Sequence, residues 1–592
     1  MRIKRLFSAL LVLSVFLSGI GIAFWATRPP APPSETNPDY PAYQQMLANI
    51  EAMTKEPHPS GSKELADVRN YLLSQIEGMG LEYDVQSTVC SLDEIAADDA
   101  ARKKEGAKKE SFKKDVKAED VQKDTLPGKV MPPSGKTFSK EEPKGQDIKN
   151  EAVFDENGNV TLYNILVKLD SPGTDSGVLF MAHYDSEFGV PGACDDMTSV
   201  CALLEAMRRQ AGNPNLKYDL YFLFTDGEEL GGMGAKVFVR DNSELKDRID
   251  LVVNMDARGT SGGLFMFESS VFDYDQVHHF KAASSHPISY SWLSMIYRQM
   301  SNGTDLTRFL NAGYHALNFA VAESVENYSS ATDDLDHLDR GTAYHFLLNA
   351  FELSDYAAGA SLKDSESRQD GVYFTLLPGL LVLMNGASAR ILTGAAVLAA
   401  LAWLIWQLRR GNIRPLRILS AAGVQLLVIA ASALMSLGAV ALADAAGFIK
   451  LLDDEMQFSI PVFMSIAAVI CVVAFAVFVL YMRKRSFTET LAGVMPLLML
   501  FAAVTAIFFN AVSYLMTLPL LGLTIAALLE KKYAAKTIVS AVVGIGILLM
   551  YVPLCWLLFI TLGLNIMPLI MALAAIPVTL IAALFRGGKR LS

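Results

Sequence analysis

Hydrophobic and polar positions alternate on two different length scales along this chain. Up to about residue 365, short apolar runs are separated by polar segments, whereas after Gly371 the apolar stretches become long enough to cross a membrane. Three runs in the first part are short and rich in Val, Leu, Ile, Phe and Tyr: VLFMAH, YDLYFLFT and LVVNM. Continuous apolar runs of this length are typical of strands that are covered on both faces. They predict an α/β domain.

The segments around these runs predict further helices and strands of the same domain. Helical spacing extends from Tyr43 to Met53 and from about Ser62 to Gly80, and Leu81 to Val89 has the composition of a first strand. Residues 152–169, AVFDENGNVTLYNILVKL, predict a hairpin with its turn at DENGN. Residues 273–345 are expected to supply more helices and the last buried strand.

Composition and charge argue against several other classes of protein. With 592 residues, of which 52% are hydrophobic, the chain is too long and too apolar for one soluble domain. A net charge of −11 offers no basic surface for nucleic acid. The five cysteines have no paired spacing, and we interpret Cys194 and Cys201 as small buried residues.

Two polar segments are expected to lie outside the core of the α/β domain. Residues 28–42 are rich in proline and predict an extended linker. Residues 93–149 are dense in Lys, Glu and Asp and have few aromatic residues, so they cannot bury enough apolar surface to offset the entropy cost of ordering. We therefore predict a charged, disordered insert within a domain that spans residues 43–365.

The long apolar segments predict an integral membrane protein. Residues 1–27 combine the basic start MRIKR with an apolar run from Leu6 to Ala26, which predicts an uncleaved membrane anchor. Residues 366–390 are apolar but are interrupted by Pro378 and Gly379, which predicts an extended segment at the membrane. A C-terminal all-α domain is expected over residues 391–592, with seven spanning helices at about 391–408, 418–443, 459–482, 491–509, 511–529, 537–561 and 565–585.

Basic residues near the ends of these segments predict their orientation, because loops rich in Lys and Arg stay in the cytoplasm. The basic groups are Arg409, Arg410, Arg414 and Arg417, then Arg483, Lys484 and Arg485, then Lys531, Lys532 and Lys536, and finally Arg586, Lys589 and Arg590. They fall in every second loop, so both termini are expected in the cytoplasm and the α/β domain outside it. The cores of the spans are almost free of ionisable residues, which argues against a coupled transporter.

Residues that can bind metal follow the three central apolar runs. His183 ends the first run, Glu228 and Glu229 follow the second, and Asp256 follows the third. Asp195 and Asp196 lie on the loop between the first two runs. Because sites in α/β sheets lie just beyond the carboxyl ends of the strands, we expect these side chains to converge. An imidazole with several carboxylates suits zinc and metal-assisted hydrolysis.

The order HYDS, GACDD, DGEELG and NMDARG resembles metallopeptidase family twenty-eight, the zinc aminopeptidases, over roughly Pro57 to Arg340. A Pro-His-Pro-x-Gly-Ser segment around His58 resembles its membrane-embedded branch, that of endoplasmic-reticulum metallopeptidase and vacuolar membrane protease. The resemblance implies a mixed twisted sheet flanked by helices. It also implies the following roles: His183 and Asp256 bind one zinc, Asp195 bridges two zincs, Glu229 binds the second, Glu228 is the general base, and Asp185 orients His183.

One departure from this family concerns the second zinc. The family has a histidine after a tyrosine near the end of the domain, and here Ser329 follows Tyr328 in ENYSSATDDLDHLD. A serine hydroxyl is a poor zinc ligand, so His337 or, less favourably, His315 is a candidate substitute. His337 also fits a solvent-exposed residue at a helix start, and His58 fits a rigid turn residue better than a ligand. Without a substitute, the chain would bind one zinc tightly and a second more weakly, or it would have lost catalysis.

Together with these patterns, the resemblance implies a membrane-anchored zinc-dependent peptidase, most consistent with an aminopeptidase, that cleaves peptides on the extracytoplasmic side. The first alternative is a catalytically silent binding or assembly module on the same fold, which Ser329 favours. A glutaminyl cyclase and a transporter with an attached hydrolase domain are less favoured. The lipid bilayer and a peptide substrate are the expected partners, and nothing in the sequence indicates an oligomeric state.

Overall fold

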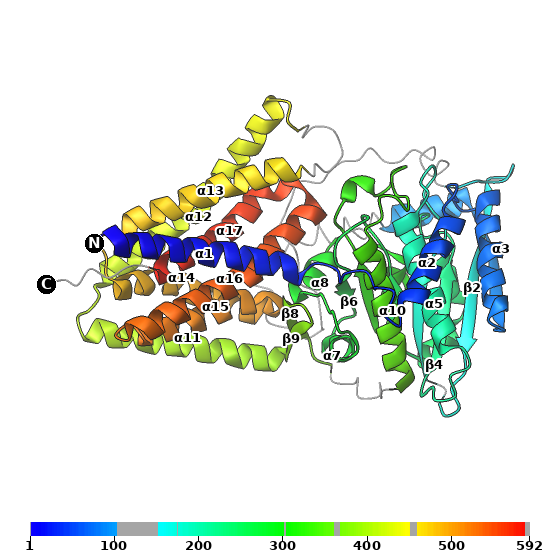
Figure 1. Cartoon of the computed structure of the whole chain (residues 1–592), viewed down its shortest axis with the longest axis horizontal. Helices are drawn as coiled ribbons and strands as arrows, with labels where there is room; N and C mark the ends of the chain where they lie inside the picture. Colours follow the sequence, from blue (N-terminus) through cyan, green and yellow to red (C-terminus); the bar gives the residue numbers. More distant parts are fainter. Residues whose placement is uncertain are drawn as a thin grey trace. The chain divides into compact units, whose positions relative to one another are not determined.

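The computed structural model describes residues 2–102, 152–174, 176–300, 303–359, 368–449 and 459–585 (Figure 1). These residues divide into two compact units. One unit contains the long apolar helices and comprises Met1–Thr27, Val372–Pro378 and Met384–Ser592. The other contains the large sheet and comprises Arg28–Gly371 and Gly379–Leu383. The predicted boundary near residue 365 lies outside the described residues.

The sheet unit is built on seven strands in the order β1-β2-β4-β3-β5-β7-β6. The strands are β1 (Tyr83–Ser91), β2 (Asn159–Leu169), β3 (Gly177–His183), β4 (Asp219–Thr225), β5 (Ile249–Met255), β6 (Phe265–Ser269) and β7 (Ala316–Ala320). The neighbours β4, β3, β5 and β7 run parallel, whereas β1, β2 and β6 each pair antiparallel to their neighbours. The predicted mixed α/β sheet is confirmed, and the three central runs are its strands β3, β4 and β5.

Helices cover both faces of the sheet, as the continuous apolar strands require. Every residue of β3 and β4 is buried. The helices α2 (Tyr40–Met53), α5 (Ser199–Gln210) and α10 (Arg340–Gly359) pack together, with α5 against β3 and α10 against β4. The helices α6 (Met233–Asp241) and α9 (Asp305–Asn311) pack together elsewhere, with α6 against β2 and α9 against β5 and β7.

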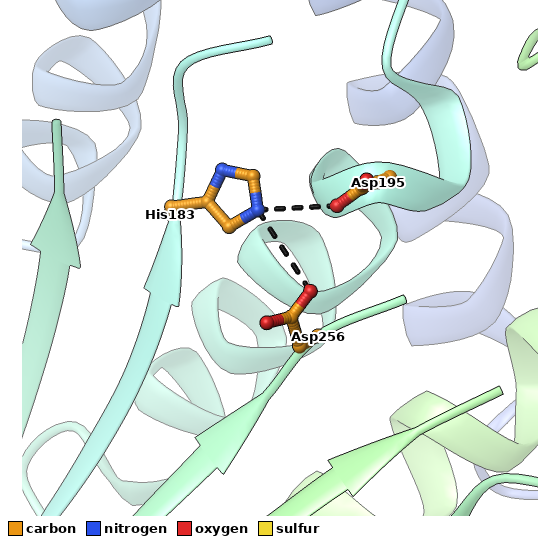
Figure 2. Close-up of side chains that lie close together, drawn as sticks. All are labelled: His183, Asp195 and Asp256. Atoms are coloured by element: carbon orange, nitrogen blue, oxygen red, sulfur yellow. Dashed lines mark hydrogen bonds and ion pairs between the residues drawn. The ribbon is translucent and has the colours of Figure 1, made fainter. Parts of the chain in front are cut away.

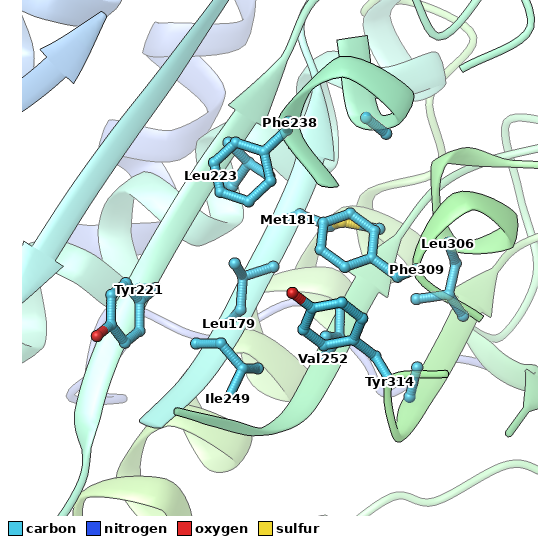
Figure 3. Close-up of a cluster of buried hydrophobic side chains, with 12 residues drawn as sticks. Leu179, Met181, Tyr221, Leu223, Phe238, Ile249, Val252, Leu306, Phe309 and Tyr314 are labelled. Carbon is cyan, nitrogen blue, oxygen red and sulfur yellow. The ribbon is translucent and has the colours of Figure 1, made fainter. Parts of the chain in front are cut away.

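A buried apolar cluster fixes α6 and α9 on the sheet (Figure 3). The strands contribute alternate residues, among them Leu179 and Met181 of β3, because side chains two apart point to the same face. Phe238 of α6 and Phe309 of α9 pack on them with ring centroids 6.0 Å apart. The cluster thus packs α9, which begins at Asp305, against the sheet.

The remaining helices of this unit complete its surface. They include α3 (Lys63–Gly78), α7 (Tyr274–Ala283), α8 (Ser291–Tyr297), the π-helical turn η2 (Ala193–Thr198) and the short 3₁₀ helices η3 (Ser243–Asp247) and η4 (Val325–Asn327). Ser62 caps α3 by accepting a hydrogen bond from the N–H of Leu65. The predicted helices at 43–53 and from about Ser62 are confirmed, as is the last strand, which is β7.

Two predictions about the first half of this unit are wrong. Residues 152–158 do not form a strand, and β2 pairs with β1 instead of with a hairpin partner. The N–H of Val153 donates to the carbonyl of Ser60, which keeps AVF out of the sheet. The predicted insert also begins too early, because residues 92–102 are helical and Ile95 is buried in a cluster with Val160 and Leu162. Residues 103–149, the greater part of that insert, lie outside the described residues.

The second unit consists mainly of long apolar helices. The helices are α1 (Arg2–Ala26), α11 (Gly386–Arg409), α12 (Pro415–Ala445), α13 (Ile460–Met482), α14 (Phe487–Phe508), α15 (Tyr514–Leu528), α16 (Tyr533–Leu562) and α17 (Met567–Leu584). All seven helices predicted after residue 390 are present. The strands β8 (Gly371–Leu377) and β9 (Leu380–Asn385) pair with each other, so the segment around Pro378 is extended as predicted.

Six helices in the described ranges are long and apolar enough to cross a membrane: Gly386–Arg409, Pro415–Ala445, Ile460–Met482, Phe487–Phe508, Ala534–Leu562 and Leu564–Leu584. Two apolar helices are shorter, Leu10–Ala26 and Tyr514–Leu528. The predicted span at 511–529 is shortened because Asn510–Val512 forms a 3₁₀ turn before α15. Helix α1 packs along α16, where Val15 is buried against Leu548 and Ile581. The number of membrane crossings stays a prediction.

Candidate metal centre

The parallel strands bring the predicted metal-binding residues to one edge of the sheet. His183 is the last residue of β3, Asp256 follows β5, and Glu228 and Glu229 lie on the loop after β4. Because β3, β4 and β5 run in the same direction, their carboxyl ends lie side by side. The N–H of Asp256 donates to the carbonyl of Phe319 in β7, which extends the sheet by one residue and fixes the direction of its side chain.

His183 lies at the centre of this group with one ring nitrogen directed at two carboxylates (Figure 2). Its Nδ1 lies 2.9 Å from the main-chain oxygen of Asp185. A carbonyl only accepts hydrogen bonds, so Nδ1 carries the proton and Nε2 is left as the free donor atom for a metal. That Nε2 lies 3.1 Å from Oδ1 of Asp195 and 3.9 Å from Oδ1 of Asp256.

Asp195 and Asp196 are held by the turn between β3 and α5. Both carboxyl groups of this pair are buried, in the π-helical turn η2, and the peptide bond between them is cis. The carboxylate of Asp333 accepts hydrogen bonds from the N–H groups of Cys194 at 2.8 Å and Asp195 at 3.1 Å. Asp196 accepts the N–H of His183 through Oδ2, and its buried Oδ1 has no hydrogen-bond partner.

Asp185 holds the loop that carries the two glutamates. Its carboxylate accepts hydrogen bonds from the N–H groups of Glu228 at 3.1 Å and Glu229 at 3.2 Å, and from the hydroxyl of Ser60 at 3.3 Å. Oδ1 of Asp185 also lies 3.5 Å from Nδ1 of His183. Asp185 therefore contacts both His183 and the loop that carries Glu228 and Glu229, whereas the sequence predicted a contact with His183 only.

The donor atoms fit a divalent metal. Nε2 of His183 and carboxylate oxygens of Asp195 and Asp256 lie within 4.8 Å of one another, and His183, Glu228 and Glu229 form a second such group. Imidazole nitrogen and carboxylate oxygen are the ligands that zinc takes in hydrolytic sites. Burial raises the pKa of Asp256 to about 7, and the negative charge of Asp195 adds to this effect. A bound cation would offset this penalty and keep the carboxylates ionised.

The histidines proposed as substitutes for the missing ligand lie away from this group. His337 is exposed, and its Nδ1 lies 2.7 Å from Oδ1 of Asp334. His315 precedes β7 at the amino end of that strand, whereas the metal-binding residues follow the carboxyl ends. Ser329 is exposed, and its hydroxyl donates to Oε1 of Glu187 at 2.8 Å. Neither histidine reaches the site in this arrangement.

Several supporting residues were not assigned these contacts from the sequence. Ser60, from the Pro-His-Pro-x-Gly-Ser segment, donates to Asp226 at 2.7 Å as well as to Asp185. The buried side chain of His58 lies in the same turn, and its Nδ1 lies 3.1 Å from the carbonyl of Glu56. Asp305 accepts a hydrogen bond from Thr225 at the end of β4. The unusual segment around His58 was the sequence signal for Ser60 and His58, whereas the contacts themselves join positions far apart in the chain.

Replacing Asp185 by asparagine is expected to lower kcat/KM for peptide hydrolysis by about 10–100-fold, the usual cost of losing a group that supports metal ligands. The amide would turn an N–H₂ group toward the N–H of Glu228 or Glu229, since both carboxylate oxygens of Asp185 accept hydrogen bonds there. Kinetics with Asp84→Asn, an exposed aspartate in β1, serve as the control. Unchanged kinetics in Asp185→Asn would show that the loop holds its position without this carboxylate.

The stability of the metal-free protein is expected to fall as pH rises. Burial is the main cause that raises the pKa of Asp195 from 3.8 to about 6 and of Asp256 from 3.8 to about 7. At a pH between the unfolded-state pKa and the raised folded-state pKa of each group, the folded state binds more protons than the unfolded state. The free energy of unfolding therefore decreases from about pH 4 to about pH 7, by on the order of 3 kcal/mol per group. Thermal denaturation of the chelated protein across this range checks the slope. Added zinc is expected to raise the Tm more at the upper end, and a flat profile would contradict the prediction.

Comparisons with known proteins agree with this geometry. Residues 164–354 match the Peptidase family M28 model, so the predicted resemblance to this family is confirmed. The putative endoplasmic reticulum metallopeptidase 1 of Schizosaccharomyces pombe is 29% identical over 255 residues, or 42% of this chain and 30% of that protein. The vacuolar membrane protease of Candida dubliniensis is 26% identical over 223 residues, or 36% of this chain and 23% of that protein. The match thus spans less than a third of either relative.

Solved structures resemble about half of the chain. An aminopeptidase from Aneurinibacillus sp. strain AM-1 has a TM-score of 0.37 and 16% identity and covers 54% of this chain and 95% of that chain. The zinc aminopeptidase BSAP from Bacillus subtilis has a TM-score of 0.35 and 14% identity and covers 54% of this chain and 96% of that chain. A glutaminyl cyclase from Fimbriiglobus ruber has a TM-score of 0.35 and 13% identity and covers 56% of this chain and 100% of that chain.

Proposed function

We propose that this protein is a membrane-anchored zinc-dependent peptidase that removes residues from the amino end of peptides, because residues 164–354 match the Peptidase family M28 model. The observation that carries this proposal is the arrangement around His183. Its Nε2 and the carboxylates of Asp195 and Asp256 lie within 4.8 Å of one another, next to the pair Glu228–Glu229. This arrangement combines a set of possible zinc ligands with a further carboxylate, that of Glu228, which is left free to act as a base.

Each residue has a distinct role in the proposed reaction. His183 and Asp256 would hold one zinc, Asp195 would contribute to this position and to a second one, and Glu229 would contribute to the second. When bound, zinc polarises the scissile carbonyl and makes a water molecule more acidic. Glu228 then takes a proton from the attacking water and delivers it to the nitrogen of the leaving group. Burial raises the pKa of Glu228 well above its ordinary value, which makes its carboxylate a stronger base.

The loop geometry supports Glu228 as the base. The N–H groups of Glu228 and Glu229 both donate to Asp185, so the backbone of the pair is fixed while its side chains remain free to point in different directions. Tyr328 lies beside the same carboxylates. Burial, together with the charges of Asp195 and Glu229, raises the pKa of its hydroxyl well above the ordinary value. The hydroxyl therefore stays protonated and can donate a hydrogen bond to a substrate carbonyl.

The peptidase domain is proposed to lie on the extracytoplasmic side of the membrane. Arg409 ends α11 and Arg414 precedes α12, whereas Arg483 follows α13 and Lys532 precedes α16. Basic residues therefore gather at alternate connections between the helices, which is the pattern of cytoplasmic loops. The domain follows the other end of α1 and precedes the other end of α11, away from these basic connections. Accessibility of an engineered glycosylation site in the exposed turn at Glu156 tests this placement.

Hydrolysis of paired peptides by the purified full-length protein in detergent tests the proposed activity. A peptide with a free amino terminus is expected to be shortened one residue at a time in a zinc-dependent reaction, and its N-acetylated counterpart is expected to remain intact. Cleavage of both would show an internal peptidase. Release of ammonia from a glutamine-terminated peptide without shortening would show a glutaminyl cyclase.

The alternative of a catalytically silent module is favoured by one feature, Ser329 in place of a histidine ligand. Zinc content separates the two functions. A silent module is expected to contain zinc without cleaving any peptide, or to contain none. A chain with stoichiometric zinc that cleaves free amino termini supports the peptidase.

A further inference from the structure

The turn that carries Glu228 and Glu229 is closed by hydrogen bonds of its own main chain. The carbonyl of Glu228 accepts the N–H groups of Gly231 at 2.7 Å and of Gly232 at 2.8 Å. Both glycines have a positive φ, 79° and 71°, a conformation that favours glycine. The orientation of this compact turn therefore depends on what holds its two ends. Asp185 holds the first end through the N–H groups of Glu228 and Glu229.

Arg308 of α9 holds the second end of the turn. Its Nη2 donates to the carbonyl of Gly231 at 2.6 Å. The same nitrogen lies 2.5 Å from Oδ2 of Asp98, and Nη1 lies 3.4 Å from Oδ1 of that carboxylate. The side chains of Arg308 and Asp98 are only 12% and 11% exposed, so this ion pair is largely withdrawn from solvent. Loss of either partner would leave a mostly buried charge uncompensated. The guanidinium is therefore fixed where it reaches Gly231.

Asp98 is held from a second direction by Lys236 of α6. Nζ of Lys236 lies 2.9 Å from Oδ1 of Asp98, and the N–H of Lys236 donates to the carbonyl of Gly232 at 3.0 Å. Burial alone would raise the pKa of Asp98, but the hydrogen bonds from Arg308 and Lys236 lower it below its ordinary value. Asp98 is therefore ionised at neutral pH and joins α6 and α9 at the far end of the turn.

The helix formed by residues 92–102 brings Asp98 to this position. Ile95, three residues earlier and thus on the same side of the helix, is buried in one cluster with Leu230 of the turn and Met233. A side chain at residue 231 would overlap the guanidinium of Arg102. The helix therefore packs directly on the turn, and the first part of the charged segment 93–149 belongs to the support of the metal centre.

We propose that Asp98 and Arg308 position Glu228 for proton transfer by fixing the far end of its turn. This rests on the proposed function, in which Glu228 is the general base. Both residues act through the main chain of residues 228–232 and are therefore positioning residues. Without the guanidinium the turn is tied at Asp185 alone and can tilt. A displacement of a reacting group by about 1 Å can lower a rate by about 10²-fold, so a small tilt is enough to matter.

Peptide hydrolysis by the full-length protein in detergent tests the proposal, with kcat calculated per zinc-loaded molecule. Arg308→Met and Asp98→Asn are each expected to lower kcat by about 10–100-fold. The KM and the zinc content are expected to stay within about twofold of the original values, because the loss concerns the chemical step. Arg240→Met removes an exposed guanidinium that pairs with Asp241, and Glu94→Gln removes an exposed charge from the helix at 92–102. Both controls are expected to keep the original kcat.

A second measurement separates positioning from a general contribution to folding. In a protein that already carries Glu228→Gln, the change Arg308→Met is expected to cause no further loss of the residual rate, because the base that it positions is gone. An equal loss with and without Glu228 would overturn the proposal. Arg308→Lys keeps the charge but lacks the fork that contacts Gly231 and Asp98 together, so it is expected to cause a smaller loss and replaces Arg308→Met if that variant does not fold.

The proposal and the proposed function fail in different ways. An original kcat in both Arg308→Met and Asp98→Asn, while the original protein contains zinc and hydrolyses peptides, would overturn the positioning role alone. Absence of zinc and of hydrolysis in the original protein would overturn the proposed function, and the positioning role with it.

Discussion

The substitution Glu228→Gln is expected to lower kcat for peptide hydrolysis by about 10³-fold, within the range that a general base contributes. The amide oxygen that replaces the carboxylate cannot take a proton from water at neutral pH. The substitution keeps the size of the side chain, and the N–H of residue 228 can still donate to Asp185. Substrate binding is therefore expected to change little, so the loss falls on kcat and not on KM.

Two measurements separate this effect from damage to the site. Zinc content and Tm are expected to stay equal to those of the original protein, because Glu228 accepts protons and is not assigned as a ligand. Glu156→Gln, in an exposed turn before β2, is the control for the loss of one negative charge. Retention of full activity in Glu228→Gln would require another base, and the proposed mechanism would then be wrong.

The arrangement of the central strands was predictable because local sequence determines it. The runs that became β3, β4 and β5 are apolar throughout, and a strand buried on both faces requires that composition. Parallel pairing then brings the residues that follow them to one edge. The convergence of His183 with Asp195 and Asp256 therefore follows from the order of elements, without knowledge of any contact.

The supporting contacts were not predictable from local patterns. Ser60 reaches Asp185 and Asp226 across more than a hundred residues of sequence, and no periodicity records such a pairing. The hairpin predicted at 152–169 failed for the same reason. DENGN has the composition of a hairpin turn, but β1 offers β2 a partner over its whole length from Tyr83 to Ser91, and this longer pairing prevails.

The second large effect is expected for His183→Ala, which should reduce peptide hydrolysis to background. Its zinc affinity should fall by more than about 100-fold, the upper end of the loss caused by removing a residue that only supports a ligand. His183 belongs to both groups of donor residues in the site, so its removal leaves only carboxylates in either group. Elemental analysis of the purified variant and titration with a zinc indicator check the loss. His278→Ala, at an exposed position of α7, is the matched control and is expected to keep zinc and activity.

The variant also distinguishes a metal ligand from a structural histidine. Burial alone would lower the pKa of His183, but the carboxylates of Asp185 and Asp195 raise it well above its ordinary value. In the metal-free protein the imidazolium thus offsets the neighbouring negative charges, and His183→Ala removes this compensation. If His183 served stability alone, the variant would lose Tm while the remaining folded protein kept its zinc and activity. If His183 binds the metal, hydrolysis is lost even at temperatures where the variant is fully folded, and zinc no longer raises its Tm as it does for the original protein.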